Sequence, residues 1–208
     1  GKLFARVEEL WNKKGSLNLN LEQAKILENR YKSFVRSGAN LSQTDKDKLR
    51  KINAELSLTS LKYGQNILAE TNKYELVISD KKELDGLPSQ LIEAAAEDAK
   101  ANGKAGKWVF TLSNSSVMPF LQYSSNRKLR KEIWNAYQTR ANHDDDLDNK
   151  ANAVKLANLR GEKARLLGYK SHSDYVLEES MAKTPENVSK LLNDLWKPAL
   201  EIAKVEAV

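Results

Sequence analysis

The sequence predicts a mainly α-helical lobe with a minor two-stranded β element. Apolar residues recur at intervals of three and four through most of the chain, which is the spacing of one buried helix face. Residues typical of helix ends divide this pattern into separate helices. Two short segments, 74–78 (YELVI) and 108–112 (WVFTL), instead combine β-branched and aromatic residues, so each is predicted to be a strand.

The N-terminal third of the chain is predicted to form three helices. The first begins at the N-terminus and ends at Gly15. Asn20, with Gln23 three residues later, resembles a capping box and begins the second helix, which ends at Gly38. Residues 42–45 begin a third, long helix. The residues expected on the buried face of the second helix are Ala24, Leu27, Tyr31, Phe34 and Val35.

The central part of the chain is predicted to combine the two strands with one helix. Pro88 or Ser89 begins this helix and Gly103 ends it. The strands can pair in either direction, and so small a sheet is stable only when it rests on helices. Residues 113–116 are predicted to be a turn-rich loop, followed by a short apolar segment at 117–123.

The stretch 126–201 is predicted to be almost continuous helix. Asp146 begins one helix, which Gly168 ends as a left-handed cap. Thr184 and Pro185 begin the last helix, because threonine accepts backbone N–H bonds and proline fits the first turn. The apolar band of the earlier helix is expected to be Leu147, Ala151, Val154, Leu159 and Leu166. The buried face of the last helix is expected to be Val188, Leu191, Leu192, Leu195, Trp196 and Ala199, and all four tryptophans are expected in the core.

Residues 1–208 are predicted to form one helical lobe, with a weak candidate boundary at 113–126. No internal repeat of fixed period is present. The chain starts with glycine rather than methionine, and its helical composition continues to Val208 without a stop signal. It is therefore predicted to be a segment of a longer protein.

Composition places the chain among ordinary soluble helical proteins. Hydrophobic residues make up 40% and charged residues 30%, which excludes the disordered class. No apolar run approaches the roughly 18 residues that span a bilayer, so no membrane partner is predicted. The net charge of +6 is a modest excess that suits a solvated surface. The absence of cysteine excludes disulfides and thiolate metal sites within the chain, and leaves cytoplasmic and periplasmic locations open.

His143 lies in an acidic segment (NHDDDLD) that allows two interpretations. In one, it binds a metal ion together with aspartates. In the other, the segment is a solvated loop whose carboxylates favour the dipole of the next helix. The loop is preferred, because the spacing lacks the glycine and the final acidic residue of a calcium-binding loop. The aspartates concerned are Asp144, Asp145, Asp146 and Asp148.

Three further segments resemble functional motifs weakly. His172 has serines on both sides and Asp174 nearby, but the members of a catalytic triad meet in space rather than along the chain. Ser171 or Ser173 is predicted to cap a helix instead. Residues 103–108 (GKAGKW) lack the ending of a P-loop and are predicted to be a flexible loop.

Residues 127–131 (RKLRK) form a basic run with aromatic residues nearby. Nucleic-acid binding requires such charges on one face. Because Glu132 follows the run and Leu129 is expected to point inward, a solvated helix face is preferred. The sequence also contains no His-Glu-x-x-His, in which two histidines bind zinc and the glutamate activates water. No catalytic residue and no metal ligand is therefore predicted, and no substrate-binding residue is identified.

The order of segments from Asn72 onward resembles the zinc metallopeptidase family of oligopeptidase A, peptidyl-dipeptidase and thimet oligopeptidase. The bacterial peptidyl-dipeptidase branch is the most similar. The segments that carry the resemblance are 74–80 (YELVISD), 81–88 (KKELDGLP), 108–112 (WVFTL), 126–134 (NRKLRKEIW), 158–169 (NLRGEKARLLGY) and 173–186 (SDYVLEESMAKTPE). The last two are the most specific, and residues 1–70 match only as a helical pattern.

This resemblance implies the N-terminal portion of a neurolysin-like helical fold. It further implies a zinc-dependent enzyme that hydrolyses short peptides in a deep channel, of which this chain forms one wall. The zinc ligands and catalytic glutamate would belong to a C-terminal lobe, the expected partner, so the chain alone is predicted to be inactive. The alternative is a helical interaction or nucleic-acid-binding module that uses the net positive charge.

Overall fold

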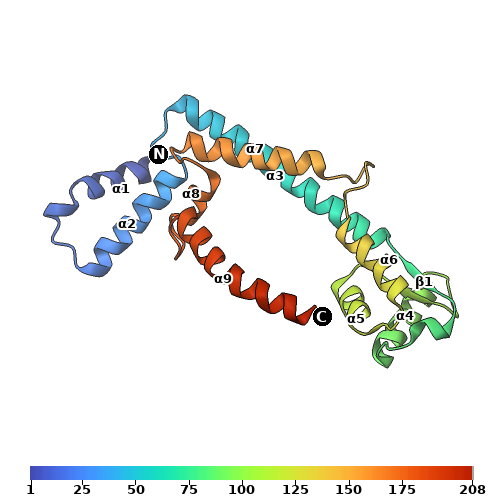
Figure 1. The fold of residues 1–208 in the computed structure, drawn as a ribbon. Helices are drawn as coiled ribbons and strands as arrows, with labels where there is room; N and C mark the ends of the chain where they lie inside the picture. Colours follow the sequence, from blue (N-terminus) through green and yellow to red (C-terminus); the bar gives the residue numbers. More distant parts are fainter. Residues whose placement is uncertain (208) are drawn as a thin grey trace. The chain divides into compact units, whose positions relative to one another are not determined.

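The computed structural model describes residues 1–207 and is mainly helical, with one two-stranded sheet (Figure 1). The predicted fold class is therefore confirmed. In chain order the elements are α1 (Lys2–Asn12), the 3-10 turn η1 (Lys14–Ser16), α2 (Leu21–Arg36), α3 (Gln43–Lys73), β1 (Leu76–Ile78), the 3-10 turn η2 (Lys81–Leu84), α4 (Ser89–Ala101), β2 (Trp108–Phe110), α5 (Asn114–Tyr123), α6 (Arg127–Gln138), α7 (Lys150–Leu166), α8 (His172–Leu177) and α9 (Pro185–Glu206). None of the described helices is long and apolar enough to cross a membrane.

The chain divides into two compact units. The first contains Gly1–Ser57 and the described residues from Leu156 onward, and the second contains Leu58–Lys155. The segment 113–126 lies within the second unit. The first unit is thus assembled from two segments that are distant in sequence.

In the first unit, α1 and α2 pack against each other as a helical hairpin (Figure 1). The indole of Trp11 stacks on Tyr31, with ring centroids 4.6 Å apart, and Phe4 contacts Phe34 at 5.8 Å. The predicted capping box is confirmed: the N–H of Gln23 donates to Asn20 Oδ1 at 2.9 Å, and the N–H of Asn20 donates to Gln23 Oε1 at 3.1 Å.

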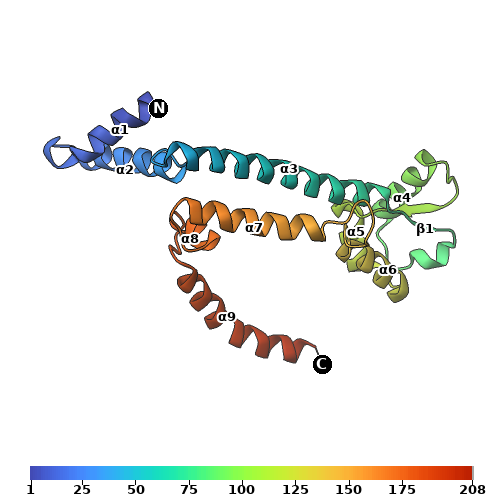
Figure 2. The same cartoon turned by 90° about the horizontal axis from the view of Figure 1, so that it is seen from above.

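The predicted buried face of α2 is only half-buried, and Ala24 is exposed. The prediction was wrong here, since α1 packs against α2 and leaves that face partly exposed. The N-terminal part of α3 runs beside α7 (Figure 2), and this contact buries Leu49, Ile52, Leu156 and Leu159. The predicted start of α3 is confirmed, since the N–H of Asp45 donates to Ser42 Oγ at 3.1 Å.

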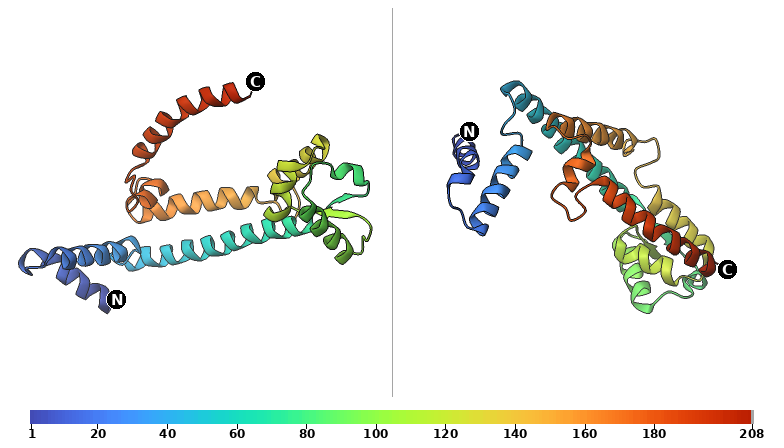
Figure 3. Two further views of the ribbon diagram at one scale, coloured as in Figure 1. Left: turned by 90° about the horizontal axis from the view of Figure 1, so that it is seen from below. Right: turned by 60° about the vertical axis from the view of Figure 1, so that its left-hand side comes forward.

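In the second unit, β1 and β2 pair in antiparallel register, with Val77 opposite Val109. The two strands are drawn as green arrows in Figure 3. Both predicted strands are confirmed, although each is shorter than the sequence indicated. The sheet rests on α4 and α5, as so small a sheet requires. Its buried residues join one apolar core, which consists of Leu76, Ile78, Leu84, Leu87, Ala95, Phe110, Leu112, Val117, Phe120, Leu129 and Ile133.

Helix α5 includes residues 114–116, which are predicted from the sequence to be part of a loop, and the short apolar segment 117–123. Its first turn is closed by the N–H of Val117, which donates to the carbonyl of Ser113 at 2.9 Å. Pro119 lies inside this helix, where it lacks the usual N–H donor. The helix forms nevertheless because Val117 and Phe120 are fully buried in the core, and that burial outweighs a weak local preference.

Helix α7 begins at Lys150, four residues after the predicted start at Asp146. The cause is Asn149, whose buried side chain accepts from Asn66 at 3.0 Å and donates to the carbonyl of Tyr63 at 2.9 Å. These contacts hold the chain outside a helix up to this residue. The predicted apolar band is therefore partly wrong: Leu147 precedes the helix, and Ala151 and Val154 are exposed.

The start of α9 is as predicted, with the N–H of Asn187 donating to Thr184 Oγ1 at 3.3 Å. Its predicted buried face is wrong for this chain, because Leu195 and Trp196 are 57% and 63% exposed. Within its unit, α9 contacts α8 and no described element runs along it. Trp134 is also half exposed, and Trp11 and Trp108 are only partly buried, so the expectation that all four tryptophans lie in the core is wrong.

Tyr74 provides a stability test in the second unit. Its ring packs against the core, and its hydroxyl is buried without a hydrogen-bond partner among the described residues. Replacing Tyr74 with phenylalanine removes this unpaired group and keeps the ring. We expect the free energy of unfolding to stay constant or to rise by up to about 1 kcal/mol. Urea unfolding followed by circular dichroism checks this, and a decrease of similar size would contradict it.

Candidate functional site

The exposed face of α6 carries three cations and a tryptophan. Arg127, Arg130, Lys131 and Trp134 stand at positions i, i+3, i+4 and i+7, which share one side of a helix. Leu129 lies on the opposite, buried side, as the sequence predicted. These four residues and Leu121 of α5 line a shallow hollow, which we call the α6 groove.

One of the three cations of the groove is held by a hydrogen bond, and the other two have no ion-pair partner among residues 1–207. The Arg130 guanidinium donates to the carbonyl of Ser124, which immobilises it. Arg127 and Lys131 form no ion pair with any residue from 1 to 207. Trp134 is 50% exposed, and its ring contacts no aromatic or cationic group of the described chain. The arrangement can therefore bind an anion beside an apolar group.

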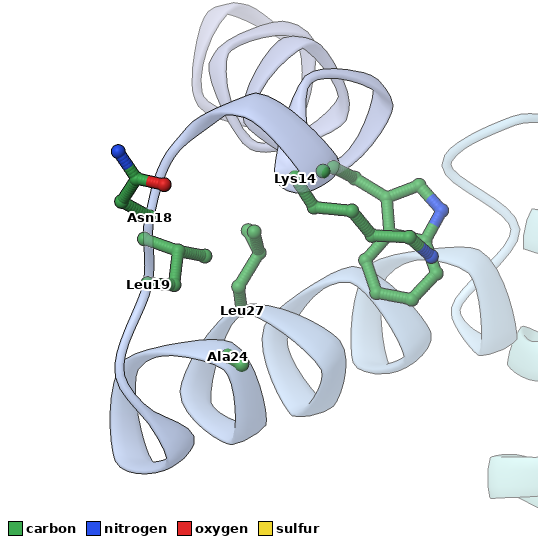
Figure 4. A pocket seen from close by; sticks show the side chains of 7 residues that line it. Lys14, Asn18, Leu19, Ala24 and Leu27 are labelled. Carbon is green, nitrogen blue, oxygen red and sulfur yellow. The ribbon is translucent and has the colours of Figure 1, made fainter.

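A second hollow lies in the hairpin of α1 and α2 (Figure 4). Lys14 Nζ lies 3.5 Å from the ring centroid of Trp11, so this lysine already has an aromatic partner. Leu19 and Leu27 form an apolar wall (Figure 4). The complete lining is Trp11, Lys14, Gly15, Asn18, Leu19, Ala24 and Leu27. It contains no acid, histidine or nucleophile, so the hollow offers an apolar contact rather than catalytic chemistry.

Arg36 is the centre of a polar cluster that ties α2 to the region of α8. Its guanidinium pairs with Glu178, donates to the carbonyl of Tyr175 at 2.8 Å and lies 4.5 Å from the centroid of the Tyr175 ring. The hydroxyl of Tyr169 donates to Glu178 at 2.6 Å. No local sequence pattern indicates this cluster, because Arg36 and Glu178 are 142 positions apart.

The cluster shifts the pKa of two of its members. Burial raises the pKa of Tyr169 to about 12, and its hydrogen bond to Glu178 acts in the same direction. The same hydrogen bond, followed by that from Arg36, lowers the pKa of Glu178. The cluster is therefore most stable with a neutral tyrosine and an ionised glutamate.

Tyr169→Phe tests this cluster. Loss of the hydroxyl is expected to lower the free energy of unfolding by about 1–2 kcal/mol near neutral pH. The unperturbed tyrosine pKa is about 10, so the unfolded chain ionises first as pH rises. Stability present below about pH 10 is therefore lost as pH approaches about 12. The pKa of Tyr74 is also raised to about 12, so the free energy of unfolding of Tyr169→Phe should still fall over this pH range, but by less than that of the original chain. Urea midpoints measured across this range check the expectation, and an unchanged alkaline loss would contradict it.

His143 lies in a solvated loop rather than in a cluster of metal ligands. Its Nε2 is 2.8 Å from Glu70 Oε1, and Glu70 also accepts from the N–H of Ala141. Asp148 accepts the N–H groups of Lys150 and of Asp144, both at 2.8 Å, and these bonds lower its pKa to about 2. Residues 1–207 contain no group of three or more metal-binding side chains. The segment is thus a hydrogen-bonded loop that precedes α7.

The other weak motifs have structural roles. Ser171 caps α8 by accepting the N–H of Asp174 at 3.2 Å, so the predicted cap is confirmed. His172 stacks near Tyr175 at 6.4 Å, and burial lowers its pKa. The glycine-rich segment 103–108 is a loop that leads into β2, as predicted.

This chain is similar in sequence to known peptidases. Residues 120–207 match the sequence profile described as Peptidase family M3. The whole chain aligns with the dipeptidyl carboxypeptidase of Escherichia coli (strain K12), at 33% identity over 213 residues that cover 31% of that protein. A probable cytosolic oligopeptidase A of Arabidopsis thaliana is 35% identical over 200 residues, which cover 92% of this chain and 28% of that protein.

More distant similarity extends to yeast. Saccharolysin of Saccharomyces cerevisiae (strain ATCC 204508 / S288c) is 28% identical over 207 residues, covering 98% of this chain and 27% of that protein. The chain thus spans between 27% and 31% of the length of these three relatives. The match extends from the first unit through the second and includes the α6 groove. This chain belongs to peptidase family M3.

Proposed function

We propose that this chain is the non-catalytic N-terminal lobe of a longer zinc-dependent peptidase that hydrolyses short peptides. The observation that carries the proposal is the alignment of the entire chain with less than a third of a dipeptidyl carboxypeptidase. The sequence contains two histidines and no His-Glu-x-x-His. In this proposal the zinc ligands and the catalytic glutamate therefore come from a C-terminal lobe.

The lobe is proposed to form one wall of the substrate channel and to pack against the catalytic lobe. Exposed leucines and a tryptophan on α9 support this role, since soluble proteins rarely leave so continuous an apolar helix face uncovered. The residues concerned are Leu191, Leu192, Leu195, Trp196, Leu200 and Ile202. In this proposal both units belong to the single lobe 1–208, and oligopeptides are the substrates of the complete enzyme.

A chimaera tests the proposal directly. Residues 1–208 replace the segment of the Escherichia coli dipeptidyl carboxypeptidase with which they align, and cleavage of a fluorogenic peptide is measured. We expect the chimaera to bind zinc and to cleave the peptide, whereas the 208-residue chain alone should do neither. A matched control carries a scrambled α9 face in the same chimaera. Zinc-dependent cleavage by the chain alone, or a folded chimaera without activity, would overturn the proposal.

The alternative is a module that binds nucleic acid through its positive charge. The specific observation in its favour is the α6 groove, where basic side chains lie beside an exposed tryptophan. Binding of this kind weakens steeply with salt, because each phosphate contact releases counterions. Tight binding of a single-stranded oligonucleotide with such a salt dependence would favour the alternative. Absence of binding at low salt would remove it.

A further inference from the structure

We propose that the α6 groove binds a carboxylate group of a peptide, with Arg127 and Lys131 pairing with the carboxylate and Trp134 packing on the adjacent side chain. This inference rests on the proposed function only in taking the ligand to be a peptide. The carboxylate can belong to the C-terminus of the peptide or to an acidic side chain. The chemistry is the same in both cases, and the experiment below separates them.

The start of α6 carries positive charge that nearby acidic residues of the helix do not compensate. Four of the first five residues of α6 are basic, and none is acidic. Cations at this end oppose the helix dipole, and like charges three or four positions apart repel each other. Some cations near other helix starts are paired, such as Lys48 with Asp45 and Lys150 with Asp148. The charge of α6 therefore costs stability that a bound anion would restore.

The neighbouring acid does not neutralise the groove. Glu132 follows Lys131 directly and so does not share the side of the helix that carries Arg127 and Lys131. Its charge acts instead on Tyr74, whose pKa it helps to raise. The groove thus keeps its positive charge within the described chain.

The ring of Trp134 is half exposed. Trp11 of the same chain, in contrast, is covered on its ring by Tyr31 at 4.6 Å and by Lys14 at 3.5 Å. Trp134 has no such partner and stands one helical turn beyond Lys131, beside the half-buried Leu121. An apolar side chain placed there would be covered on two sides while its neighbouring carboxylate reaches the cations.

The size of the groove favours a peptide over a longer polyanion. From Arg127 to Trp134 the helix rises about 10 Å. This length matches about three residues of an extended peptide. Strong binding of nucleic acid commonly uses six to ten phosphate contacts, roughly twice the number of cations in this groove or more. A short ligand with one carboxylate and one apolar side chain fits the groove best.

Binding of three short peptides to the 208-residue chain tests the inference. All are N-acetylated and contain phenylalanine: one has a free C-terminal carboxylate, one is its C-terminal amide, and one is an amide with an added glutamate. At low ionic strength we expect the free acid to bind roughly tenfold more tightly than the neutral amide. Equal binding of the glutamate peptide identifies any carboxylate as the ligand, whereas weak binding identifies the C-terminus. Equal binding of the neutral amide would overturn the inference.

Variants assign the binding to the groove. The double variant Arg127→Gln with Lys131→Gln should lose the preference for the free acid. Trp134→Ala should lower the binding affinity for all three peptides. Lys128→Gln is the matched control, because Lys128 belongs to the same basic run but does not line the groove. An equal loss in Lys128→Gln would mean that net charge alone acts. Tighter binding of an oligo-dT of about ten nucleotides through the same residues would also overturn the inference, in favour of nucleic acid.

This test is independent of the chimaera experiment. If the chimaera is active but the double variant binds peptides normally, the inference fails and the proposed function stands. If the chimaera is folded and inactive but the carboxylate preference depends on Arg127 and Lys131, the proposed function fails and the groove remains a carboxylate site. Circular dichroism of each variant confirms that the helices are retained.

Discussion

Replacing Phe110 with alanine is expected to lower the free energy of unfolding of the second unit by about 3–5 kcal/mol. Phe110 is fully buried, and its ring meets that of Phe120 edge-on at 4.7 Å between centroids. Truncation removes apolar contact area and leaves a cavity that the rigid sheet cannot close.

Urea unfolding followed by tryptophan fluorescence measures this effect, since Trp108 lies in the same strand and contributes to the signal. Val77→Ala is the control, because Val77 lies in the paired strand but is 37% exposed. The control is expected to cost less than about 1 kcal/mol. A Phe110→Ala loss no larger than that of the control would show that the sheet does not rest on this core.

Gly86→Ala is expected to cost about 3 kcal/mol, the sum of a conformational and a steric effect. Gly86 has φ of +81°, a left-handed conformation that costs other residues about 1–2 kcal/mol. A Cβ atom would also lie 2.3 Å from the carbonyl oxygen of Tyr123, so the two backbone segments must separate. That movement breaks the 2.9 Å hydrogen bond from the N–H of Ser125 to the carbonyl of Asp85. Loss of this bond lowers the free energy of unfolding by about 1 kcal/mol more.

Gly106→Ala separates the two causes. Gly106 has nearly the same backbone conformation, with φ of +83°, but nothing lies within 4 Å of the place that an added methyl group would take. Gly106→Ala is expected to lower the free energy of unfolding only by the conformational cost, about 1–2 kcal/mol. Thermal unfolding of the two variants under identical conditions compares them. Equal losses would exclude the close approach of Tyr123 as a cause.

Local signals in the sequence predicted most helix ends correctly. The capping box at Asn20 and the start at Thr184 depend on side chains that bond within three residues, so neighbouring residues determine them. Gly168 is also a local signal, because its φ of +89° after the end of α7 is a left-handed conformation that favours glycine. The start of α7 was wrong because the buried contacts of Asn149 come from α3, which no local pattern reports.

Burial was predicted less well than secondary structure. The spacing of apolar residues identified the apolar face of α9 correctly, but that face is exposed. Such spacing shows which side of a helix is apolar and not whether another segment of the chain covers it. The same holds for Trp134. The basic run of α6 was visible in the sequence, but the groove it forms with Leu121 of α5 depends on how two helices pack.

The sequence by itself determined the helical class, the two strands, the helix caps and the resemblance to the M3 peptidases. These features depend on residue type and on spacing over a few positions. Only the tertiary structure decided the antiparallel pairing of the strands, the helix at α5 and the cluster around Arg36. The physical reason is that each of these depends on burial or charge contacts between segments distant in sequence, whose free energy exceeds the local preference of either segment.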